Sequence, residues 1–156
     1  MRKCILILDN IRSVANTGLI FRTADRFSVS RIVLVGITPT PLDRFGRKRK
    51  DFAKVSLGTE DRVSWKYEKR IEPAINKLQK TGFEIVALER IANAENLKNF
   101  KPKNKFALIV GSEINGVSKE ALDLSNRVVE ISMKGMKESL NVSVATGVAL
   151  YNLLNK

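Results

Sequence analysis

The chain has 156 residues, a length that predicts one compact domain. It carries 28 Lys and Arg against 16 Asp and Glu, and the resulting formal net charge of +12 favours a polyanionic partner. It has no His and one Cys, which excludes imidazole bases, His-ligated metals, Cys-rich zinc sites and disulfides within the chain. Apolar runs reach only about five residues, far short of the ~20 that span a bilayer, so we expect a soluble cytoplasmic protein with no membrane or metal partner.

Short apolar runs rich in β-branched residues and leucine predict buried strands. In chain order they cover residues 4–8, 31–35, 84–88, 106–110 and 128–131. Cys4 opens the first run, which predicts a buried structural thiol rather than a nucleophile. Helical patterns lie between the runs, so the fold class predicted is α/β, with a mostly parallel sheet flanked by helices.

Three helices stand out between these strands. The first is predicted to start with Asn16 as its N-cap and to carry Ile20, Ala24 and Phe27 at the i, i+4, i+7 spacing of one helix face. The second covers residues 73–81 and ends before a glycine. The third covers residues 140–154, and its small side chains predict close packing against another helix, one that a second subunit could supply. Residues 36–66 have weak periodicity, which is typical of functional or mobile loops.

The common nucleotide-binding signatures are absent. No G-x-G occurs, which excludes the dinucleotide fingerprint. Residues 111–116 have the G-x-x-x-x-G spacing, but Val117 stands where a phosphate-binding loop needs Lys.

Polar side chains instead follow the predicted strands, at the edge where open α/β sheets bind ligands. Asn16 and Arg22 follow the first strand, Glu113 follows the fourth, and Ser139 and Asn141 follow the fifth. Their spacing alone also permits structural roles. Asn16 would then cap a helix, Arg22 would pair with Asp25 on the surface, and Glu113 would be an acid in the first turn of a helix.

Three stretches resemble motifs one, two and three of the SpoU (TrmH-like) branch of the SPOUT RNA methyltransferases. They are NTGLIFRTAD at 16–25, IVGSEINGVS at 109–118 and ISMKGMKESLNVSVA at 131–145. Their order and spacing match across the whole chain, and Ser139-Leu-Asn-Val-Ser143 is the most specific part. Ser132 departs from the family, which commonly has Pro at that position.

The resemblance implies a C-terminal deep trefoil knot, a homodimer and S-adenosyl-L-methionine as cofactor. The pocket for that cofactor would be lined by Leu88, Gly111, Ile131, Met133 and Leu140. The implied reaction is methyl transfer to a ribose 2′-hydroxyl of tRNA or rRNA, with catalytic positions at Asn16, Arg22, Glu113, Ser139 and Asn141. A guanidinium with a pKa above ~12 is a poor base, which favours phosphate clamping and alkoxide stabilisation by Arg22 over the proton removal that the family implies.

Many members of that family carry an extra N-terminal substrate domain, but here the first strand is predicted to begin near residue 3. We therefore expect residues 1–156 to form a single methyltransferase domain with no separate RNA-binding domain, which would bind RNA itself. Phe45 and Phe52 interleave with a basic run, a pattern that suits phosphate contacts and base stacking but also occurs in solvated loops. The basic residues expected to contact RNA are Arg12, Arg44, Arg47, Lys48, Arg49, Lys134 and Lys137.

Two other functions are consistent with the same fold. One is a non-catalytic RNA-binding protein with a knotted fold, and the other is a SPOUT enzyme that methylates a base. The complete set of motifs disfavours the first, because a pure binder needs no cofactor loop. The Ser139-Leu-Asn141 sequence disfavours the second.

Overall fold

The computed structural model describes residues 1–137 and 139–156. Seven strands form one sheet in the order β3-β2-β1-β6-β4-β7-β5, and every pair of neighbouring strands is parallel. The strands are β1 (Lys3–Asp9), β2 (Arg31–Val35), β3 (Trp65–Glu68), β4 (Glu84–Leu88), β5 (Glu95–Asn96), β6 (Lys105–Gly111) and β7 (Arg127–Glu130). The predicted fold class is confirmed.

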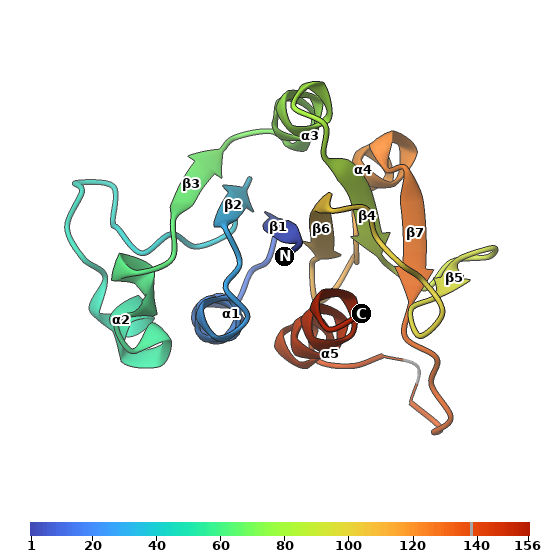
Figure 1. The fold of residues 1–156 in the computed structure, drawn as a ribbon. Coiled ribbons are helices and arrows are strands. Elements are labelled where there is room, and N and C mark those ends of the chain that lie inside the picture. Colours follow the sequence, from blue (N-terminus) through green and yellow to red (C-terminus); the bar gives the residue numbers. More distant parts are fainter. Residues whose placement is uncertain (138) are drawn as a thin grey trace.

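Helices cover both faces of the sheet. They are α1 (Val14–Arg26), α2 (Lys50–Ser56), α3 (Ile71–Lys80), α4 (Lys119–Leu124) and α5 (Val142–Leu154), with a 3₁₀ turn at Thr59–Asp61. Figure 1 shows α1, α2 and α5 on one face and α3 and α4 on the other. Within the described part of the chain, no helix is long and apolar enough to cross a membrane.

The central strand β1 explains why the strand runs are apolar without alternation. Cys4, Leu6 and Leu8 pack into the core beneath α1, α2 and α5, whereas Ile5 and Ile7 pack into the core beneath α3 and α4. Successive side chains of a strand point to opposite faces, so a strand covered on both faces must be apolar at every position. Cys4 is buried as predicted, and burial raises the pKa of its thiol, which makes it inert.

The first and the last helix begin at other residues than the sequence predicted. Ser13, not Asn16, is the N-cap of α1, because its hydroxyl accepts a hydrogen bond from the Asn16 backbone N–H at 3.1 Å. Asn16 thus lies in the first turn, and its side chain is free for other contacts. At the other end of the chain, α5 begins at Val142, and Asn141 is its N-cap.

Several short elements were missed by the sequence analysis. The stretch 36–66 contains α2 and the start of β3, and β5 and α4 follow later. Strand β3 lies at the edge of the sheet with half-exposed side chains, and α2 has only seven residues. Neither presents enough apolar periodicity to be recognised.

All the parallel strands end at the same edge of the sheet. Going along this edge, the segments that follow β2, β1, β6, β4 and β7 lie side by side. This arrangement brings together, at one edge of the sheet, residues that are far apart in sequence.

Candidate active site

A cavity of about 730 Å³ opens at the carboxyl ends of β4, β6 and β7. Its walls are residues 88–91 at the end of β4, residues 110–117 at the end of β6, residues 130, 131 and 133 at the end of β7, and residues 139–142 and 145 at the start of α5. The volume lies within the range of ~300–1,000 Å³ that is typical of small-molecule sites.

The five residues expected to bind the cofactor all line this one cavity: Leu88, Gly111, Ile131, Met133 and Leu140. They come from three different strand ends and from the segment before α5. Position 111 must be glycine for a packing reason, since a Cβ there would lie 2.1 Å from the backbone of Gly116 and Val117. The turn at 112–116 closes against it through paired backbone hydrogen bonds between Ser112 and Gly116 of 2.9 and 3.1 Å.

Glu89 is a cavity residue that the sequence analysis missed. Its carboxylate accepts hydrogen bonds from the backbone N–H groups of Val117 and Arg90, both at 2.8 Å. Gly116 makes room for it, because a Cβ on that residue would lie 2.1 Å from Glu89 Oε2. The available sequence signal was an acidic residue placed directly after a buried strand, at the ligand-binding edge.

Three of the predicted catalytic residues form a chain of hydrogen bonds. Asn16 Nδ2 donates to Glu113 Oε1 at 3.1 Å, and Asn141 Nδ2 donates to Asn16 Oδ1 at 3.1 Å. Glu113 and Asn141 line the cavity, as does Ser139, whereas Asn16 reaches the cluster from α1. The fold therefore joins residues from α1, the segment after β6 and the start of α5 at the rim of the cavity.

Glu113 anchors this cluster to the start of α1. Its carboxylate also accepts hydrogen bonds from the backbone N–H groups of Arg12 at 3.1 Å and Ser13 at 3.3 Å. Partial burial opposes ionisation, but these bonds and the one from Asn16 outweigh it and hold the pKa of Glu113 below its ordinary value. The interpretation of Glu113 as an acid in the first turn of a helix is wrong, since the residue lies in the turn after β6, and its carboxylate instead meets the start of α1 from outside that helix.

Asn141 has two roles in the structure. Its Oδ1 accepts a hydrogen bond from the Ser143 N–H at 2.9 Å, which caps α5, while its Nδ2 holds Asn16. One side chain therefore ties the position of α5 to that of α1.

Arg22 lies apart from this cluster. It is exposed on α1 and does not line the cavity, and it makes no hydrogen bond or ion pair with any residue that the structure describes. The interpretation of Arg22 as a surface partner of Asp25 is wrong, since Asp25 pairs with Arg62 at 3.0 Å. The guanidinium is consequently available to a ligand.

The basic residues expected to bind RNA fall into two groups. Arg12, Lys134 and Lys137 are exposed, the two lysines in the segment between β7 and the cavity residue Ser139. The second group, the basic residues at 44–49, directly precedes α2, and Arg49 is the N-cap of that helix. Phe52 was expected to join them in base stacking, and this is wrong: its side chain is fully buried and packs edge-on against Phe21, with ring centroids 5.3 Å apart.

Comparison with known proteins identifies relatives of this chain. A tRNA (guanosine(18)-2′-O)-methyltransferase of Aquifex aeolicus is 31% identical over 151 residues, which cover 94% of this chain and 66% of that protein. A solved TrmH/SpoU tRNA modifying enzyme of A. aeolicus superimposes with a TM-score of 0.84 at 28% identity, over 99% of this chain and 75% of the other. An AdoMet-bound rRNA methyltransferase of Sinorhizobium meliloti gives a TM-score of 0.86 at 25% identity, over 96% and 55%.

The chain thus spans just under two thirds of the length of the Aquifex methyltransferase. The trefoil knot stays a prediction, as do the roles of the individual site residues. The model of the SpoU rRNA Methylase family matches residues 3–151, almost the entire sequence. This chain therefore belongs to the SpoU rRNA methylase family.

Proposed function

We propose that this chain transfers a methyl group from S-adenosylmethionine to a ribose 2′-hydroxyl of tRNA or rRNA. The observation that carries the proposal is the cavity at the carboxyl ends of β4, β6 and β7, with the hydrogen-bonded chain Asn141–Asn16–Glu113 at its rim. The names of the relatives agree with it, since one is a 2′-O-methyltransferase of tRNA and another is an rRNA methyltransferase with bound AdoMet.

The cavity residues suit S-adenosylmethionine in size and chemistry. Apolar walls at Leu88, Ile131 and Leu140 match an adenine ring, while Glu89 and Glu130 add carboxylates that complement a cation and can accept hydrogen bonds from hydroxyl groups. The cofactor would supply a methyl group already activated by its sulfonium. The protein is then left with positioning and with the charge that develops on the attacking oxygen.

The rim residues divide this work. The Asn141–Asn16–Glu113 chain fixes the start of α1 and the start of α5 against the cavity, which positions the acceptor hydroxyl. Arg22 has no protein partner among the described residues, so its guanidinium can neutralise an RNA phosphate and the developing alkoxide. No nucleophilic side chain is needed, which suits a chain without His.

A homodimer is the assembly that the surface of α5 supports. This helix contains no charged residue, yet Val144, Val148 and Tyr151 on it are 52%, 40% and 65% exposed. An exposed apolar helix face of this kind is typical of an interface. Val148→Lys should yield monomers in sedimentation analysis. The control Asp123→Lys, at an exposed position of α4, should leave the dimer intact. A monomeric wild type would refute the proposed homodimer.

The decisive experiment is methyl transfer from labelled S-adenosylmethionine to total tRNA and rRNA, followed by nucleoside analysis. We expect 2′-O-methylated nucleosides. In the cell, the proposed reaction takes place in the cytoplasm, where these RNAs reside. Arg22→Ala should abolish transfer, whereas Arg26→Ala, at an exposed position of the same helix, should not. Methyl groups on bases would identify a base-methylating enzyme, and RNA binding without transfer would identify a binding protein.

A further inference from the structure

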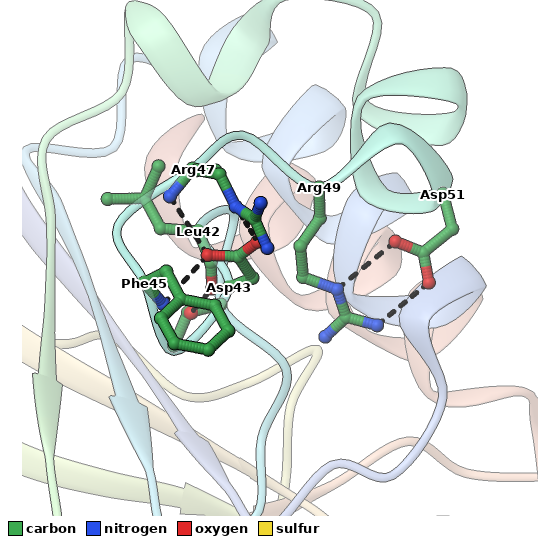
Figure 2. A network of polar contacts seen from close by, with 7 residues as sticks. Leu42, Asp43, Phe45, Arg47, Arg49 and Asp51 are labelled. Carbon is green, nitrogen blue, oxygen red and sulfur yellow. Dashed lines mark hydrogen bonds and ion pairs between the residues drawn. The ribbon is translucent and has the colours of Figure 1, made fainter.

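Residues 41–49 form a tight hairpin between β2 and α2, which we call the Phe45 hairpin. Leu42 and Lys48 pair as an antiparallel bridge, and the Asp43 N–H donates to the Arg47 carbonyl at 2.8 Å. Asp43 also organises the tip with its side chain, which accepts from the N–H groups of Phe45 at 2.8 Å and Arg47 at 2.9 Å (Figure 2). A loop held in this way loses little conformational freedom when a ligand binds.

Most of the positive charge of the hairpin is already paired within the protein. Arg47 Nε lies 3.0 Å from Asp43, and Arg49 makes a two-pronged contact with Asp51 at 2.7 and 3.1 Å (Figure 2). Lys48 Nζ lies 2.8 Å from Asp61. A phosphate would have to compete with these carboxylates. The basic run is therefore less suited to clamping the RNA backbone than its sequence indicates.

The tip of the hairpin instead presents an aromatic ring. Phe45 is 67% exposed, and the guanidinium carbons of Arg44 and Arg47 lie 4.8 and 5.0 Å from its ring centroid. The neighbouring Gly46, with φ of +76°, completes the turn, and the backbone of Phe45 is held by Asp43. The result is a largely exposed aromatic ring with two guanidinium groups over it, carried on a turn that the hydrogen bonds to Asp43 hold.

We propose that Phe45 is a stacking platform for an unpaired base, and hence that the RNA substrate carries a single-stranded nucleotide some distance from the methylated ribose. Every base has an aromatic face that can stack on Phe, and adjacent guanidinium groups strengthen such stacking. A base within a duplex has both faces covered by its neighbours. The inference rests on the proposed function, because it takes RNA as the substrate.

The position of the hairpin supports a macromolecular ligand. The hairpin follows β2 and the cavity lies at the ends of β4, β6 and β7, so both belong to the same edge of the sheet, with β1 between them. Figure 1 shows α1 between α2 and α5 on the face that joins these two regions. A ligand that touches both the cavity and Phe45 must extend across α1, which carries Arg22, and RNA is long enough to do so.

Binding measurements with Phe45→Ala, Phe45→Trp and the matched control Ile37→Ala test this inference. Ile37 is 64% exposed in the same connection between β2 and α2, so its substitution removes a similar apolar surface without an aromatic ring. The affinity of the cofactor-free protein for methylatable tRNA or rRNA would be measured by fluorescence anisotropy at several salt concentrations. A fully duplex RNA of equal length would serve as the second ligand.

We expect Phe45→Ala to weaken binding of the substrate RNA roughly 5- to 100-fold. Phe45→Trp should restore the affinity, and Ile37→Ala should leave it unchanged. Loss of a stacking contact removes no cation, so the salt dependence of binding should keep its slope, whereas loss of one phosphate contact would reduce that slope by about one. Duplex RNA should bind the wild type and Phe45→Ala equally.

Two outcomes would overturn the inference. One is an unchanged affinity of Phe45→Ala for the substrate RNA. The other is a loss of affinity for duplex RNA equal to the loss for the substrate RNA. Binding is measured without methyl transfer, so the result is separable from the proposed function. A wild type that methylates RNA while Phe45→Ala binds normally refutes the stacking platform alone. A wild type that binds RNA through Phe45 without transferring methyl groups refutes the enzymatic function alone.

Discussion

Replacement of Glu113 by Gln is the most informative single change in the rim cluster. The carboxylate accepts three hydrogen bonds, from the backbone N–H groups of Arg12 and Ser13 and from Asn16 Nδ2. Glutamine keeps one acceptor oxygen and directs an NH₂ group toward the remaining donors. The variant therefore loses at least one charge-assisted bond and leaves a donor at the start of α1 without an acceptor.

Hydrogen bonds to charged groups contribute ~1.5–3 kcal/mol each when they are shielded from water, and the exposed position of Glu113 reduces this value. We expect Glu113→Gln to lower the free energy of unfolding by ~1–2 kcal/mol in urea at pH 7. For a domain of this size that corresponds to a Tm lower by roughly 2–8 °C. The control Glu72→Gln, which removes an exposed carboxylate that pairs with Arg70 on α3, should remain close to wild type.

The pH dependence provides a second readout. The folded state lowers the pKa of Glu113, so its carboxylate stabilises the protein above the pKa of the unfolded chain, about 4.3, and this contribution disappears as the pH falls through the lower folded value. The difference between wild type and Glu113→Gln should therefore shrink below about pH 4. Equal unfolding free energies at pH 7, or a difference that persists unchanged in acid, would refute the assignment of Glu113 as an ionised anchor of α1.

Two further variants separate structural from catalytic effects in the same region. Asn141→Ala should lower the free energy of unfolding by ~1 kcal/mol, through loss of the cap, and should lower kcat about 100-fold. Asn141→Ser should recover the unfolding free energy but not kcat, because serine can cap α5 but has no amide for Asn16. Full activity in Asn141→Ser would contradict this. Gly116→Ala should weaken S-adenosylmethionine binding in calorimetry, since its Cβ would displace Glu89 and its φ is +67°. Gly46→Ala has the same backbone strain with no atom within 4 Å of its Cβ, so equal binding losses in the two variants would argue against a role for Glu89.

Local patterns in the sequence were sufficient for the elements that are most buried. The run at 4–8 is apolar at every position because β1 is covered on both faces, and this requirement is visible without the structure. The pocket residues were implied by the family resemblance and not by local patterns, and all of them line the cavity, where the carboxyl ends of parallel strands meet at one edge. Short or half-exposed elements such as β3 and α2 escaped prediction, since their stability comes from packing rather than from periodicity.

Only the tertiary structure could decide which polar groups meet. Asn16 and Glu113 are 97 positions apart, and Asn16 and Asn141 are 125 positions apart, yet parallel strand order brings them into hydrogen-bonding distance. The same holds for charge: Lys48 belongs to a basic run in the sequence, but in the fold it pairs with Asp61 from beyond α2. Composition and spacing determine which reactive side chains this protein has. Contacts between residues distant in sequence decide which of those side chains remain free for a ligand, because hydrogen bonds and ion pairs form only over a few ångströms.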